Sequence, residues 1–98
     1  MGDLLGAFKE EAPISQGMLD GTIKFHEKGF IYEGPGIEGK VYSYNHYIER
    51  LEKLSEPVLG SIGVRMIFFS TLGERVDVRF QINEHYFHEL MDRKIGRV

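Results

Sequence analysis

Apolar and polar residues alternate over residues 20–26, which predicts a β-strand. A turn at residues 27–29 follows, and an extended run resumes at residues 30–32, so the two strands form a hairpin. The glycine- and proline-rich residues 34–39 are predicted to be a loop, because these residue types interrupt regular structure. Residues 40–44 then form a third strand, and the order indicates an antiparallel meander.

Two further strands are predicted at residues 64–70 and 75–82. The first is largely apolar on both sides, as is typical of a central strand. The second has apolar residues at even positions and polar residues at odd positions, which gives it one buried face. Residues 71–74 form the turn between them.

The end of the chain has the spacing of an amphipathic helix. Asn83 is a favourable N-cap, the helix is predicted to run from Glu84 to about Lys94, and Gly96 ends it. One side of this helix is expected to pack on the sheet. The residues on that side are Phe87, Leu90, Met91 and Ile95.

Residues 1–19 are predicted to form either a short helix or a loose N-terminal arm that precedes a single domain at residues 20–95. Asp3 could cap the helix and Pro13 could stop it. Gly6 weakens a helix by up to about 1 kcal/mol relative to alanine, and terminal segments are often disordered. The helical face would contain Leu4, Leu5, Phe8 and Ala12.

Residues 45–54 are predicted to form a second helix, with Asn45 as its N-cap. The apolar residues at helical spacing are Tyr47, Ile48, Leu51 and Leu54. The alternative is an irregular strand, which would continue the meander. Pro57 and Gly60 end the segment in both cases.

Length and composition agree with one globular domain, since the 98 residues are 42% hydrophobic and 28% charged. We therefore expect an α+β fold, in which an antiparallel sheet or a partly open barrel is closed by a C-terminal amphipathic helix. The edge strands of such a sheet need covering, and pairing with a second copy is one solution. A homodimer is a further expectation.

Charge and cysteine content exclude several classes of protein. The net charge of −3 argues against nucleic acid as a partner, because neutralising phosphates requires an excess of Lys and Arg. The chain has no cysteine, which excludes disulfides, thiolate metal sites and thiol nucleophiles. Its apolar runs are too short for a signal peptide or a membrane span, so a cytoplasmic location is the default expectation.

The segment HYFHELMD, residues 85–92, places four possible metal ligands on one polar stripe of the predicted helix: His85, His88, Glu89 and Asp92. Histidine and carboxylate ligands suit zinc and other divalent metals. A solvated helix face also requires polar residues, and the spacing differs from that of the two-histidine zinc helix. We favour the solvated face and expect no bound metal.

No serine lies in a nucleophile motif, and the glycines of residues 34–39 lack the Lys-Ser/Thr ending of a phosphate loop. We therefore expect neither an enzyme nor a cofactor. The basic residues nearest the first hairpin are Lys24, Lys28 and Lys40, and they are the candidate residues for binding a ligand or partner. Glutamates interrupt this cluster, so the support for an anionic lipid is weak.

The segments GTIKFHEKGFIYEG, VYSY, NHYIERLEKL, VRMIFFSTLGERVDVRFQI and NEHYFHELMDRK follow one another in an order that resembles the small pleckstrin-homology-like superfold, especially its GRAM and prokaryotic versions. The resemblance covers roughly residues 20–94. It implies two antiparallel sheets in a partly open barrel, with the C-terminal helix plugging one end. It also implies seven strands, so that residues 47–54 would have to form one.

Three functions are consistent with these features. The first is a non-catalytic, adaptor-type interaction module that binds a protein or peptide, either beside the closing helix or at a sheet edge. The second is recognition of an anionic lipid or nucleotide by the three lysines. The third is metal binding on the C-terminal helix.

Overall fold

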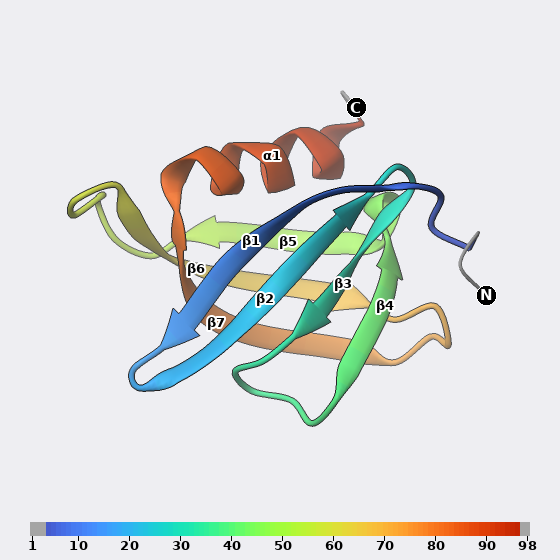
Figure 1. Cartoon of the computed structure of the whole chain (residues 1–98), viewed down its shortest axis with the longest axis horizontal. Coiled ribbons are helices and arrows are strands. Elements are labelled where there is room, and N and C mark those ends of the chain that lie inside the picture. Colours follow the sequence, from blue (N-terminus) through green and yellow to red (C-terminus); the bar gives the residue numbers. More distant parts are fainter. Residues whose placement is uncertain (1–3, 97–98) are drawn as a thin grey trace.

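A computed structural model describes residues 4–96, which form seven strands and one α-helix (Figure 1). In sequence order the strands are β1 (Phe8–Gln16), β2 (Leu19–His26), β3 (Gly29–Glu33), β4 (Lys40–Tyr44), β5 (Ile48–Lys53), β6 (Ser61–Phe69) and β7 (Arg75–Asn83). A 3-10 turn, η1 (Asn45–Tyr47), joins β4 to β5, and the helix α1 (Glu84–Ile95) follows β7.

All seven strands belong to one antiparallel sheet with the order β4-β3-β2-β1-β7-β6-β5. The two halves of the sheet, β1–β4 and β5–β7, lie across one another (Figure 1). They are joined by a short seam between β1 and β7 that contains only the pairs Ile14–Ile82 and Ser15–Gln81. The sheet does not close into a barrel, because β4 and β5 remain its two ends. The predicted α+β fold is confirmed, and its layout is compatible with the pleckstrin-homology-like one.

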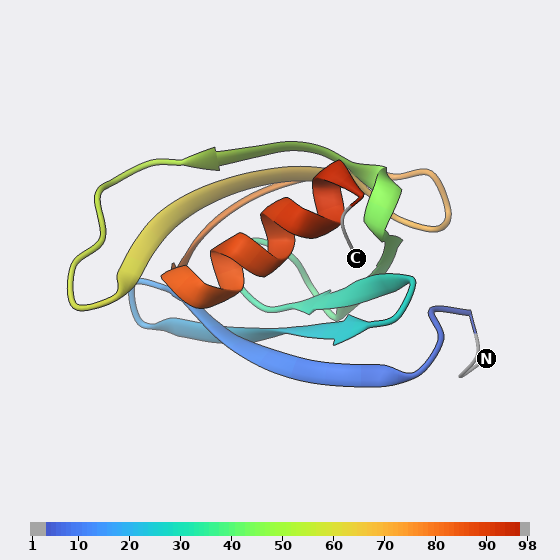
Figure 2. The ribbon, with the colours of Figure 1, turned by 90° about the horizontal axis from the view of Figure 1, so that it is seen from above.

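The core lies between the two halves of the sheet. Its largest fully buried side chains come from both halves, and they include Tyr32, Phe25, Phe30 and Phe68. Phe68 contacts Phe30 edge to face, with ring centroids 5.1 Å apart. Seen from above, α1 lies in the opening between the halves (Figure 2). Its Phe87 and Leu90 join the core cluster, so the helix supplies the side chains that fill this opening.

The helix predicted at residues 45–54 is wrong, and the alternative strand is correct. Only η1 is helical, and β5 pairs with β6. The register shifts by one residue between Ile48 and Arg50, which is a β-bulge. The extra residue brings Ile48 and Leu51 to the same buried face. The three-residue spacing of Ile48 and Leu51, which is typical of a helix, is therefore produced here by a bulge in a strand.

The short helix or loose arm predicted at the N-terminus is also wrong for the described part of that segment. Phe8–Gln16 is strand β1, which pairs with β2 along its whole length. Only Ala12 and Ile14 are buried in β1, so the strand shows little apolar alternation. Pro13 lies just outside the residues of β1 that pair with β7. A strand tolerates proline at such a position, because no partner strand needs its backbone N–H there. Residues 1–3, including the proposed cap Asp3, lie outside the described residues.

The C-terminal helix is confirmed with both of its predicted ends. The Asn83 side chain accepts a hydrogen bond from the backbone N–H of His85 at 2.8 Å, and Gly96 adopts a left-handed conformation with φ of 82°. The packed side differs from the prediction at two positions. Ile95 is 50% exposed, whereas Arg93 is buried. None of the helices in residues 4–96 has the length and apolar character needed to cross a membrane.

Candidate functional site

The polar stripe of α1 does not assemble into a metal site. His85 and His88 are exposed, and the Glu89 carboxylate accepts a hydrogen bond from Arg93 Nε at 2.8 Å. Within residues 4–96 there is no group of three or more histidine or acidic side chains that could hold a metal ion. The two histidines lie on the solvated face of the helix.

The three candidate lysines lie on different elements of the first half of the sheet. Lys24 is in the middle of β2, Lys28 is in the β2–β3 turn, and Lys40 begins β4. In the register of the sheet, Lys40 lies two strands and two residues away from Lys24, so their backbones are about 12 Å apart. Each has a glutamate as its cross-strand neighbour, Glu11 for Lys24 and Glu33 for Lys40. The lysines do not converge on one point, and their role in binding stays a prediction.

Arg93 is the residue that sequence reasoning missed. Its guanidinium enters the fold from the last turn of α1 and lies 4.8 Å from the centroid of the Phe25 ring. Its Nη1 donates to the backbone oxygens of His26 and Gly29 and to Asn45 Oδ1, at 2.6, 3.2 and 2.9 Å. The helix is therefore anchored to the inner side of the β2–β3 turn.

On its outer side, the same turn holds the N-terminal residues 4–7. Backbone bonds join Glu27 N–H to the oxygen of Ala7 and Lys28 N–H to the oxygen of Leu5. The Glu27 carboxylate also accepts from Ala7 N–H at 2.8 Å, and His26 Nδ1 lies 3.0 Å from the Gly6 oxygen. These bonds fix the segment before β1 against the sheet, and Leu5 is buried as a result.

This N-terminal segment forms one wall of an apolar hollow with a volume of about 400 Å³. The floor is the outer face of β2–β4, and the opposite wall is the β6–β7 turn. The lining residues are Leu4, Leu5, His26, Ile31, Tyr42, Thr71 and Leu72. Alternation along these strands places polar residues on the face opposite the core, so apolar residues here are a departure from the pattern.

The rim of the hollow is apolar as well. Leu72 at the tip of the β6–β7 turn is 86% exposed, and Leu4 and Tyr42 are each 41% exposed. Phe8 is also exposed and contacts the edge of the His26 ring, with centroids 5.7 Å apart. The hollow and its rim form a continuous apolar surface, which is a typical property of interaction sites.

The free edge of β4 is partly closed beside this hollow. Thr71 N–H donates to the backbone oxygen of Tyr42, and the Ser43 hydroxyl donates to the oxygen of Phe69 at 2.6 Å. The β6–β7 hairpin is thus held against β4. At Tyr42 the hairpin therefore occupies the edge position that a partner strand would take.

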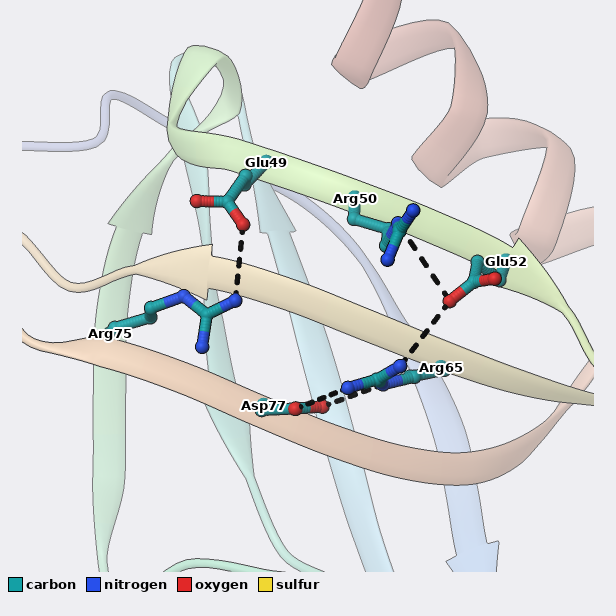
Figure 3. A network of polar contacts seen from close by, with 6 residues as sticks. All are labelled: Glu49, Arg50, Glu52, Arg65, Arg75 and Asp77. Atoms are coloured by element: carbon teal, nitrogen blue, oxygen red, sulfur yellow. Dashed lines mark hydrogen bonds and ion pairs between the residues drawn. The ribbon is translucent and has the colours of Figure 1, made fainter.

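The outer face of β5–β7 differs in chemistry, since it carries alternating charges (Figure 3). Arg65 forms a bidentate ion pair with Asp77, in which Nε and Nη2 donate to the two carboxylate oxygens at 3.0 and 2.7 Å. Its Nη1 lies 3.6 Å from Glu52 Oε1. The hydrogen bond with Arg65 holds the pKa of the Asp77 carboxyl below its ordinary value. Ile67 lies in register between Arg50 and Asp77 and is only 2% exposed, so it is covered although it lies on the outer face. This face offers no apolar site.

Comparison with known proteins adds no assignment. No protein family model matches the chain. No curated protein matches it either.

Proposed function

We propose that this protein is a non-catalytic interaction module, similar in layout to pleckstrin-homology-like domains, that binds a protein partner in the apolar hollow beside β4. The supporting observation is the hollow itself, which is concave and apolar and has a volume of about 400 Å³. It lies on a sheet face where polar residues are the norm. Its walls are fixed by backbone hydrogen bonds on both sides, at Leu5 and at Thr71. A partner would meet a largely preformed site.

The exposed rim favours a protein partner over a small molecule. Leu72 and Phe8 project beside the hollow and are 86% and 54% exposed. A side chain that filled the hollow would bring its flanking residues against these groups and remove them from water. The hydrophobic contribution is about 25 cal/mol per Å² of apolar surface buried, before the entropic cost of association. A small ligand confined to the hollow would leave them exposed.

Site-specific photo-cross-linking in the native host tests this proposal. A photoreactive phenylalanine derivative would replace Leu72 at the hollow, and in a control protein it would replace Leu59. Leu59 is fully exposed in the β5–β6 loop and takes no part in the hollow. We expect a protein captured from position 72 but not from position 59.

The captured protein would then be purified and titrated against the unmodified chain and against Tyr42→Glu. A carboxylate at this half-exposed position places a charge in the hollow, so affinity should fall at least about tenfold. Capture from both positions alike, or an affinity unchanged by Tyr42→Glu, would show that the hollow is not the binding site.

A further inference from the structure

The hydrogen bond between His26 and Gly6 determines where the histidine carries its proton. His26 Nδ1 lies 3.0 Å from the backbone oxygen of Gly6. A carbonyl oxygen can only accept a hydrogen bond, so Nδ1 must be the donor. In a neutral imidazole the other nitrogen, Nε2, is then an acceptor with a lone pair. Nε2 has no hydrogen-bond partner among residues 4–96.

His26 is also one of the residues that line the hollow. Most of its neighbours there are apolar, including Leu5, Ile31 and Leu72. An acceptor in such surroundings discriminates between ligands, because covering it without a donor removes it from water at a cost, whereas a ligand with a donor avoids this cost. The site therefore favours a group that is apolar in its body and carries one N–H or O–H.

Resting on the function proposed above, we infer that the hollow takes an aromatic side chain with a hydrogen-bond donor, a tyrosine or tryptophan of the partner, and that His26 Nε2 accepts from it. Phenol and indole groups combine a large apolar surface with a single polar group. The volume of about 400 Å³ lies within the usual range of about 300–1,000 Å³ for such sites. Phe8, which contacts the His26 ring, adds an aromatic neighbour at the rim.

Small aromatic probes test this inference on the wild-type protein, by titration followed in amide NMR spectra. 4-Methylphenol has the donor, and 4-methylanisole is the same ring with the donor methylated. 3-Methylindole and 1,3-dimethylindole form a second pair of this kind. We expect the probes with a donor to bind about threefold to tenfold more tightly than their methylated partners, which corresponds to one neutral hydrogen bond. The shifted amides should be those of lining residues such as Ile31 and Thr71.

The variant His26→Asn separates the hydrogen bond from the effect of the added methyl group. The asparagine amide reaches about as far as Nδ1 and can still donate to Gly6, but it has no atom in the place of Nε2. In this variant each pair of probes should bind with nearly equal affinity. Thermal unfolding would check that the variant is folded. If it is not, equal binding of the two probes of each pair to the wild-type protein still overturns the inference.

Each outcome has a separate meaning. Equal binding of donor and methylated probes to the wild-type hollow overturns this inference, while capture at Leu72 would keep the proposed function. A donor preference that persists in His26→Asn assigns the acceptor to another group and also overturns it. If no probe shifts the lining residues, the hollow does not accept aromatic groups. If capture at Leu72 fails too, the proposed function falls with the inference.

Discussion

Replacing Arg93 by methionine should destabilise the protein far more than its position near the end of the chain suggests. Methionine keeps an unbranched apolar stem, so the packing on Phe25 is partly retained. The guanidinium and its hydrogen bonds to the β2–β3 turn are lost. The backbone oxygens of His26 and Gly29 would then have no donor from α1.

The expected loss is about 3–5 kcal/mol. Leaving a buried acceptor without a partner costs about 1–3 kcal/mol, and two carbonyls lose a charged donor here. The partly buried Glu89 carboxylate also loses its ion pair with Arg93, which adds to this cost. A protein of this size is stable by only about 5–15 kcal/mol, so the variant would lose a substantial fraction of that margin.

Urea unfolding followed by circular dichroism would measure this loss, with the slope against urea unchanged. Melting temperature should fall by at least about 12 °C, given roughly 4–8 °C per kcal/mol for a domain of this length. Arg79→Met is the matched control, because Arg79 is exposed on β7, and it should change stability by less than about 0.5 kcal/mol. A loss below about 1 kcal/mol for Arg93→Met would refute the anchoring role.

Three further predictions concern local structure. Asn83→Ala should cost about 1 kcal/mol in urea unfolding through loss of the helix cap, and an unchanged midpoint would contradict this. The lowered pKa of Asp77 implies stability that is present above the ordinary value of 3.8 and is lost as pH falls through the lower folded value. Asp77→Asn should therefore be less stable than wild type at neutral pH, and unfolding at pH 7 and pH 2 should show the difference shrinking in acid. Gly29→Ala should cost about 2 kcal/mol or more, because a Cβ there would lie 2.1 Å from a backbone oxygen of β4. Gly63→Ala, where the nearest contacts are side-chain atoms at 3.3 Å, should cost less in the same assay.

Sequence periodicity was sufficient to predict a strand or helix where one face of the element is buried and its backbone is regular. It identified β2, β7 and α1, including both caps of the helix. It failed at β5 because a bulge changes the period, and this bulge contains no glycine that would mark it in the sequence. It failed at β1 because Ala12 and Ile14 are the only buried residues of that strand, so the pattern is too sparse to read.

The apolar hollow had one local signal in the sequence. The run Phe30-Ile31-Tyr32 lacks the polar residue that alternation would place at its middle position, and Ile31 is the residue that lies on the hollow's floor. The walls could not be predicted, because Leu5 and Leu72 come from distant parts of the chain. The same reason applies to the anchoring role of Arg93, because the backbone oxygens of His26 and Gly29 are close to it only after folding.

The short seam between β1 and β7 has a consequence for hydrogen exchange. The strand pairing between the two halves of the sheet consists of two residue pairs, and α1 fills the opening between the halves. If the helix detaches, the seam loses its support and the core between the halves becomes accessible to solvent. The amides of Ile14 and α1 should therefore exchange through one shared opening event with a single free energy. The hairpin of β6 and β7, with nine residue pairs, should exchange only through global unfolding.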